Sequence, residues 1–378
     1  ADTGQLFIYI NNTIQASGAA INETIKGNFT GKDVFIMHER YNGGGLDIYN
    51  FGQDSSFADA ETAQGNADGE GFGDFFYSPP SGYLALCSAN LPDPPIDPAK
   101  DETPEDHFNT VLWTGNNSVP RNITGVGFSP DWIWVKDRIA SNNNVLVDTV
   151  RGISELLYSN STVAGVTSAT QISAVGTDGF TIGATTYMNE NGSSNKYVAW
   201  NWLAGTAFSN DASATSVGSI DSEGQVNTKA GFSIVKFTTD GETSGTVAHG
   251  LTDSDGNGIQ PQLLIGKTRN HAVSWYVQTP LLATNIAGIL SGTDAFYNPG
   301  YNHWNDTHPT TSVFSVGGYM AGHSDLTSPS TKIVYCFANV EGYQKIGLYE
   351  GNGSSNGAFV FTGFRPAFLL AKSIDSTS

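Results

Sequence analysis

Three stretches of the chain follow one pattern, in which a proline precedes a run of apolar residues and a lysine follows it. The proline and the lysine are six positions apart each time, in 127-GFSPDWIWVKDR-138, 259-IQPQLLIGKTR-269 and 363-GFRPAFLLAKSID-375. Short apolar runs bounded by turn residues are typical of β-strands. Proline is tolerated at the start of a strand because its missing N–H lies outside the ladder. The pattern therefore predicts three equivalent strands, each with its lysine returning to solvent.

A second strand pattern precedes each of these stretches. Its three forms are 108-FNTVLWTG-115, 232-FSIVKFTT-239 and 345-KIGLYEG-351. The first two units also close alike, on 196-KYVAWNWLAG-205 and 332-KIVYCFANVEG-342. We therefore expect two tandem copies of one module and the beginning of a third. Helical periodicity is sustained nowhere, so we predict an all-β protein of tandem β-sandwich modules, jelly-roll or concanavalin-like in kind.

The repeat sets the predicted domain boundaries. The first module covers residues 107–205, the second covers 231–343, and residues 344–378 begin the third. Residues 206–230 are rich in Ser, Ala, Asp and Gly, and this composition predicts a linker or a long loop.

The front of the chain has a different character. Residues 1–77 alternate apolar and polar residues in short runs separated by Gly and Asn, which predicts strands and hairpins. Residues 78–106 are dense in proline and acidic residues and are expected to form a semi-rigid spacer. Because the chain opens almost inside a strand, at 5-QLFIYINN-12, we expect it to be part of a longer polypeptide.

Several sequence blocks resemble a known family. FNTVLWTGN, GFSPDWIWVKDR, VAWNWLAG and IVYCFANVEG occur here in one order, and this order resembles a β-rich domain of unknown function. That domain recurs in tail-fibre and virion structural proteins of marine tailed phages, cyanophages among them. The resemblance covers residues 107–378. The front segment, with LDIYNFGQD and FFYSPPSGYLALCSANLP, is similar to the C-terminal part of a concanavalin-like or SPRY-like sandwich. The family has no established catalytic residues, so the resemblance implies only architecture and context.

The charge balance bears on the partners of the chain. The net charge is −19, with only 17 Lys and Arg. Phosphate binding needs a basic stripe, and none is visible, so we expect no nucleic-acid partner. No stretch approaches the ~20 apolar residues of a membrane span, so no membrane insertion is expected.

Cys87 and Cys336 each lie in an apolar setting and are expected to be free thiols rather than a disulfide.

One loop begins like a calcium-binding loop. In 253-DSDGNGI-259, the oxygen ligands of Asp253, Asp255 and Asn257 alternate before a glycine. The twelfth position is Leu264, so the closing acidic ligand is missing. Two interpretations stay open, a Ca²⁺ site at these three residues and a plain hairpin turn rich in Asp and Gly.

Aromatic side chains are the other candidates for binding. Tyr297, Tyr301 and Trp304 lie in a loop rich in Gly, Asn and Asp, where exposed rings can stack on sugars. We therefore predict them as glycan-binding residues.

The same loop contains side chains with metal-ligating chemistry. His303, Asp306 and His308 lack the periodicity that would bring them together, so a polar loop packed by Trp304 is favoured over a metal site. Two further tryptophan pairs each share one face of a strand, which predicts that they lie in the core: Trp132 with Trp134, and Trp200 with Trp202.

These features together favour a protein that is not an enzyme. Tandem modules without a catalytic motif, in a chain that resembles phage fibre proteins, predict a virion surface protein. We expect a tail fibre or a similar appendage that attaches to host-surface glycan. By the same resemblance, the partners are other virion proteins and two further copies of the chain in a homotrimer. Two alternatives stay open: a tailspike-type enzyme that degrades polysaccharide, which requires two facing carboxylates, and a cellular surface adhesin.

Overall fold

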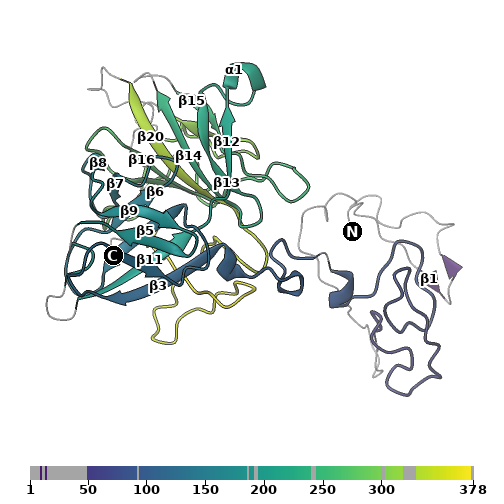
Figure 1. Cartoon of the computed structure of the whole chain (residues 1–378). Helices are drawn as coiled ribbons and strands as arrows, with labels where there is room; N and C mark the ends of the chain where they lie inside the picture. Colours follow the sequence, from purple (N-terminus) through teal and green to yellow (C-terminus); the bar gives the residue numbers. More distant parts are fainter. Residues whose placement is uncertain are drawn as a thin grey trace. The chain divides into compact units, whose positions relative to one another are not determined.

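The computed structural model divides into two compact units, Ala1–Asp93 and Pro94–Ser378. It describes residues 9–10, 13–14, 49–91, 93–184, 187–190, 195–239, 244–298, 303–317 and 329–375 (Figure 1). The ordered elements are almost entirely β-strands in antiparallel sheets, as the sequence predicts. The division between the units falls inside the predicted spacer 78–106, which contains three short 3-10 helices: Ser88–Asn90, Pro98–Lys100 and Pro104–Asp106.

The first unit contains little regular structure among its described residues. Strands β1 (Tyr9–Ile10) and β2 (Thr13–Ile14) pair with each other, and the other strands predicted before residue 49 lie outside the described residues. The strands predicted between 49 and 77 are wrong, because this stretch forms turns with one isolated bridge. The Asp68 carboxylate accepts hydrogen bonds from several backbone N–H groups, and the pKa of Asp68 falls to about 2, led by the bond from Ala85. Backbone groups held in this way cannot join a ladder.

The first module of the second unit is a two-layer sandwich. Its large sheet has the order β3-β11-β5-β6-β7-β8, and its small sheet has the order β4-β10-β9. The strands are β3 (Phe108–Thr114), β4 (Arg121–Thr124), β5 (Trp132–Asp137), β6 (Val145–Asp148), β7 (Glu155–Tyr158), β8 (Val166–Thr167), β9 (Ile172–Gly176), β10 (Gly179–Ile182) and β11 (Lys196–Trp202).

The second module repeats this arrangement. Its large sheet has the order β12-β13-β14-β20-β16-β17-β18, and β15 pairs with β19 in the second layer. The elements are β12 (Thr206–Asn210), α1 (Ala212–Thr215), β13 (Ser222–Asn227), β14 (Phe232–Thr239), β15 (Gly245–Ala248), β16 (Leu263–Thr268), β17 (Tyr276–Gln278), β18 (Gly288–Ile289), β19 (Val313–Val316) and β20 (Ser330–Phe337). Residues 206–230 are therefore not a linker, because β12 and β13 extend the sheet at β14.

The two modules share one topology. The order β3-β11-β5-β6-β7 recurs as β14-β20-β16-β17-β18, and the pair β4–β10 recurs as β15–β19. In both copies the first strand and the strand that follows the proline flank the last strand, and both pair with it antiparallel. The repeated sequence pattern thus corresponds to a repeated pattern of strand pairing.

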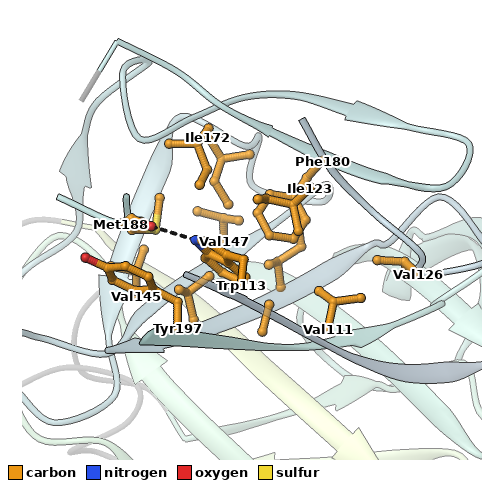
Figure 2. Packing of buried hydrophobic residues seen from close by; sticks show 14 of the residues in the cluster. Val111, Trp113, Ile123, Val126, Val145, Val147, Ile172, Phe180, Met188 and Tyr197 are labelled. Carbon is orange, nitrogen blue, oxygen red and sulfur yellow. Dashed lines mark hydrogen bonds between the residues drawn. The ribbon is translucent and has the colours of Figure 1, made fainter. Parts of the chain in front are cut away.

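Three apolar clusters hold the second unit together. One fills the first module between its sheets, where Trp113 lies among Val145, Val147 and Phe180 and donates a hydrogen bond of 3.0 Å from Nε1 to the carbonyl of Met188 (Figure 2). A second cluster fills the second module. The third lies between the two large sheets, so the central strands of each large sheet are buried on both faces.

The predicted core tryptophans belong to the third cluster. Trp132 stacks on Tyr335 of the second module with 4.3 Å between ring centroids, and Trp202 lies against Trp132 at the same distance. Trp132, Trp134 and Trp202 are buried and Trp200 is partly buried, so the predicted burial is confirmed. Their rings face the other module, whereas Ile133 and Val135 of the same strand face their own module's interior.

The lysines that follow the apolar runs behave differently from the prediction. Lys136 and Lys372 are half-buried, but Lys267 has no exposed surface. Its Nζ donates to the carbonyl oxygens of Val273 and, at 2.9 Å, of Thr162 in the first module. Packing of the large sheets covers the end of β16, so this lysine does not return to solvent.

Candidate functional site

A shallow depression lies beside the loop that the sequence predicts for glycan binding. The segment between β17 and β18 forms one side, and the segment before β19 forms the other. Its lining residues are Thr284, Asn285, Ile286, Ala287, His303, Trp304 and Asp306. Thr284, Asn285 and Asp306 are exposed and bring a hydroxyl, an amide and a carboxylate to the rim. These groups donate and accept hydrogen bonds of the kind that sugar hydroxyls make.

The floor of the depression is part of the core of the second module. His303 stacks on Tyr276 with 3.8 Å between ring centroids, and burial lowers the pKa of His303 to about 4, so its ring is neutral at pH 7. Trp304 is 2% exposed and meets Phe314 edge to face at 6.2 Å. The Trp304 Nε1 is buried and has no acceptor within the described part of the chain. The floor is therefore buried and uncharged.

Tyr297 stands next to this depression with its ring accessible. Its backbone exchanges two hydrogen bonds, of 3.0 and 3.1 Å, with Ala287, which lines the depression. The ring of Phe296 packs so closely on Gly288 that a Cβ at Gly288 would approach it to 2.6 Å. With Phe296 held inward and 41% of Tyr297 exposed, an aromatic face is fixed at the rim.

The structure gives no accessible aromatic ring at the other residues that the sequence predicts for glycan binding in the described part of this loop. Tyr301 lies outside the described residues. Trp304 is not available for stacking on a sugar, because its ring is buried in the core. His308 Nε2 bonds the Leu282 carbonyl oxygen at 2.8 Å. Across the described ranges, no three His, Cys, Asp or Glu side chains come together as a metal site. Trp304 packs the described part of this loop onto the core of the second module, as the sequence predicts.

The Asp253 loop forms a turn closed by its own side chain. The Asp253 carboxylate accepts hydrogen bonds from the backbone N–H groups of Asp255 (2.9 Å) and Asn257 (2.8 Å), and from the Asn257 side-chain amide (3.1 Å). These bonds, the one from the Asn257 side chain foremost, lower the pKa of Asp253. The three residues predicted as Ca²⁺ ligands share one turn, in which Asp253 is half-buried and Asp255 and Asn257 are exposed. A calcium site here stays a prediction.

A buried charged cluster joins the two modules. The Asp148 carboxylate pairs with Arg151 at 2.5 Å and accepts a hydrogen bond of 2.7 Å from the Tyr335 hydroxyl across the interface. Both charged side chains are almost completely buried. Burial, and then the neighbouring Asp148 charge, raises the pKa of Tyr335 well above its ordinary value. Asp148, Arg151 and Tyr335 all have bonding partners inside the protein, so the cluster is suited to stabilising the contact between the modules rather than to reacting with a substrate.

Two buried lysines lie on adjacent strands of the second module. Lys332 has no exposed surface, and its Nζ donates a hydrogen bond of 2.7 Å to the Thr268 hydroxyl. Burial, and to a smaller extent the charge of Lys267, lowers the pKa of Lys332 to about 7. Burial lowers the pKa of Lys267 to about 8. Perturbed lysines often mark functional sites, but these two have no exposed surface from which to meet a substrate.

The two cysteines are free, as the sequence predicts. Cys87 and Cys336 are free thiols, and burial raises the pKa of Cys336 to about 12. Within the ranges that the structure describes, no helix has the length and apolar character needed to cross a membrane.

Comparison with known proteins places the second unit in a family. No curated protein and no solved structure matches the chain. A family model does match residues 103–378, a range that begins just before β3 and includes both modules and the segment after β20. The chain therefore belongs to the family described as Domain of unknown function (DUF7483).

Proposed function

We propose that this protein is a non-enzymatic surface protein of a virion, a tail fibre or a similar appendage, and that it attaches to host-surface glycan. The observation that supports attachment is the exposed Tyr297 ring beside a depression with polar groups on its rim and a rigid core beneath it. Sugar recognition commonly combines an aromatic face with convergent hydrogen-bonding groups. The virion context is supported by the resemblance of the sequence to phage fibre proteins.

The packing of the modules suits a display role. The central strands of each large sheet are buried on both faces, and a fully paired charged cluster crosses the interface, so the two modules hold each other in one orientation. A rigid body of this kind keeps its surface loops in fixed positions. As a homotrimer it would present three such loops, and three weak sugar contacts together give a higher avidity than one.

Binding to bacterial surface polysaccharides tests the attachment proposal. The chain is applied to immobilised lipopolysaccharide and capsular polysaccharide, and Tyr297→Ala is compared with Tyr83→Ala, which removes an exposed tyrosine from the first unit. We expect Tyr297→Ala to weaken binding about tenfold or more, the loss of about 1.4 kcal/mol, while Tyr83→Ala leaves binding unchanged. No binding by the unaltered chain, or equal binding by both variants, would refute a glycan site at Tyr297. Release of reducing ends from the polysaccharide would instead support the tailspike-type enzyme.

Location and assembly are tested separately. Immunogold labelling of virions with an antibody raised against residues 94–378 is expected to decorate an appendage. Light scattering on the full-length protein is expected to give the mass of a trimer. Labelling of cell surfaces without labelling of virions would favour the adhesin, and a monomer at micromolar concentration would rule out the trimer.

A further inference from the structure

A buried histidine lies where the spacer enters the first module. His107 follows the 3-10 helix Pro104–Asp106 and directly precedes β3, and only 6% of it is exposed. Its carbonyl oxygen accepts a hydrogen bond of 2.9 Å from the Leu203 N–H. Its ring meets the Tyr343 ring edge to face at 6.1 Å, and Tyr343 is neutral, because burial raises its pKa. The ring of His107 is therefore enclosed within the second unit.

Each ring nitrogen of His107 has one partner. Nε2 lies 3.1 Å from a Glu102 carboxylate oxygen, and Nδ1 lies 2.9 Å from the side-chain nitrogen of Asn227, at the end of β13. Glu102 also accepts a hydrogen bond of 2.6 Å from Lys229, which lies in the turn between β13 and β14. Residues 102–107 are therefore bonded to the second module through two side chains, and we call these bonds the spacer contact.

The bonds of Asn227 determine which form of the histidine fits. Its Oδ1 accepts a hydrogen bond of 3.1 Å from the Ala230 N–H, and its Nδ2 donates one of 3.0 Å to the Leu203 carbonyl oxygen. Nδ2 is the atom that faces His107, and an amide nitrogen can only donate. The Nδ1 of His107 must therefore accept, so the single ring proton is on Nε2 and bonds Glu102. The spacer contact requires a neutral ring.

A second proton on the ring is incompatible with this arrangement. The imidazolium has an N–H at both nitrogens, so two donors would face each other 2.9 Å apart at His107 and Asn227. Turning the Asn227 amide over does not help. The turned amide would set Oδ1 against the Leu203 carbonyl oxygen and Nδ2 against the Ala230 N–H. The charged ring must therefore move away from Asn227.

The charges around the ring agree with the hydrogen-bond argument. Burial lowers the pKa of His107 below its ordinary value of 6.5; the charges of Glu102 and Asp106 oppose this fall, and that of Lys229 adds to it. As the pH falls below 6.5, an open form of the spacer contact binds a proton that the closed form does not, so acid favours opening.

The two carboxylates beside the ring stay ionised in mild acid. Burial opposes a low pKa at Glu102, but the hydrogen bond and the charge of Lys229 outweigh it, together with His107. The pKa of Asp106 is lowered first by the hydrogen bond from the Thr103 backbone N–H. Opening near pH 5 therefore has its cause at His107 and not at these carboxylates.

We propose that His107 is a proton switch, which holds residues 102–107 against the turn between β13 and β14 at neutral pH and releases them in acid. The step adds one proton from solvent to Nδ1 and changes no covalent bond between heavy atoms. The ion pair of Glu102 with Lys229 contributes little by itself, because 51% of the Lys229 side chain is exposed. The released residues belong to the segment that joins the two units, so acid loosens this join. The proposal does not rest on the function proposed above.

Hydrogen exchange at two pH values tests the switch. Backbone exchange of the full chain is followed by mass spectrometry at pH 7.5 and pH 5. Each rate is divided by that of an unstructured peptide of residues 94–110, which removes the intrinsic effect of pH. We expect the protection of 102–107 to fall by about tenfold at pH 5, where one group with an open-form pKa of 6.5 can supply at most about thirtyfold. The protection of β14 and β20 should stay unchanged.

Two variants at the spacer contact isolate the titrating group. Glutamine offers one donor and one acceptor and gains no proton near pH 5, so in His107→Gln the protection of 102–107 should be equal at both pH values. Asn227→Asp should reverse the effect. The new carboxylate accepts a hydrogen bond from a protonated Nδ1, so protection at pH 5 should be at least as high as at pH 7.5. His308→Gln is the matched control, because His308 is half-buried and bonds a carbonyl oxygen in another loop; it should behave as the wild type does.

Three results would overturn the proposal. The wild type keeps its protection of 102–107 at pH 5, or β14 and β20 lose protection to the same extent, which is a general effect of acid. The third is a variant that opens in acid as the wild type does. If His107→Gln does not fold, Asn227→Asp decides this third point, because it retains the histidine and changes only the partner that selects the neutral ring.

Discussion

Replacement of Lys332 by methionine should stabilise the protein below about pH 8. Lys332 has no exposed surface and no carboxylate partner in the described part of the chain; its Nζ bonds only the Thr268 hydroxyl there. Burial is the main reason that its pKa falls from 10.5 to about 7. The lysine is therefore tolerated in the fold at a cost in stability, and methionine has a similar length without the charge.

The size of the effect follows from the pKa. A tenfold change in an acid constant corresponds to about 1.4 kcal/mol, so a fall from 10.5 to about 7 makes charging of Lys332 roughly 5 kcal/mol more costly in the folded chain than in the unfolded one. Methionine also leaves the Thr268 hydroxyl without its donor, which costs about 1–3 kcal/mol. The net gain for Lys332→Met at low pH is therefore about 2–4 kcal/mol.

The sign of the pH dependence is fixed by the lowered pKa. Between about pH 7 and pH 10.5 the unfolded chain binds a proton at Lys332 that the folded chain does not, so stability rises with pH over this interval. The advantage of the methionine variant should then be greatest at pH 7 and below, shrink as the pH rises, and become a disadvantage of about 1–3 kcal/mol toward pH 10.5, where only the cost at the Thr268 hydroxyl remains. Groups that titrate alike in both proteins, such as Cys336, cancel in the comparison.

Urea unfolding followed by tryptophan fluorescence measures the difference. Titrations of the wild type and of Lys332→Met at pH 6.5, 8 and 10 give the free energy of unfolding at each pH. Lys136→Met, which alters a half-buried lysine bonded to Asn144, controls for the loss of an ammonium group in general. A Lys332→Met variant that is destabilised by the same amount at all three values would refute the reasoning.

Four further predictions concern the module interface and the Asp253 loop. Asp148→Asn should lower the free energy of unfolding by about 3–5 kcal/mol, because it leaves the buried Arg151 guanidinium without its counter-charge; Tyr335→Phe, which removes one hydrogen bond, should cost about 1–3 kcal/mol in the same urea titration. Trp132→Ala should cost about 3–5 kcal/mol by opening a cavity between the two large sheets, and an unchanged unfolding midpoint would mean that the sheets do not pack there. Millimolar Ca²⁺ should raise the melting temperature of the wild type but not of Asp253→Ala, and no heat of binding in calorimetry would leave the loop as a plain turn.

The repeated strands could be predicted because their local and tertiary requirements agree. The apolar runs at 132–137 and 263–268 are bounded by turn residues, and both form central strands. Strands β12 and β13 could not be predicted in the same way. They lie on the edge side of β14 and have few apolar residues, in TAFSN and SEGQVN, so their pairing depends on β14 and not on their own composition.

Polar side chains explain why the strands predicted between 49 and 77 do not form. Asp54 and Asp68 each accept hydrogen bonds from several nearby backbone N–H groups, so the alternating stretch between 49 and 77 turns instead of extending. Hydrophobic alternation alone does not reveal this competition. The candidate depression could not be predicted from the sequence for another reason. Thr284 and Asn285 lie in an ordinary polar turn, and only the fold brings them beside Asp306, some twenty residues later in the chain.

The apolar run at 132–135 indicates burial on both faces as well as a β-strand. A strand with one buried face alternates, whereas Trp132, Ile133, Trp134 and Val135 are apolar without a break, which is typical of strands covered on both faces. The structure accounts for this, because the tryptophans meet the second module while the aliphatic residues meet the first module's own interior. Residues 368–371 form the same unbroken run, FLLA, but the third strand predicted from the repeat is wrong for this segment, where Phe368 packs on Trp202 and Leu369 is exposed. An unbroken apolar run therefore indicates a strand covered on both faces only where neighbouring strands pair with it.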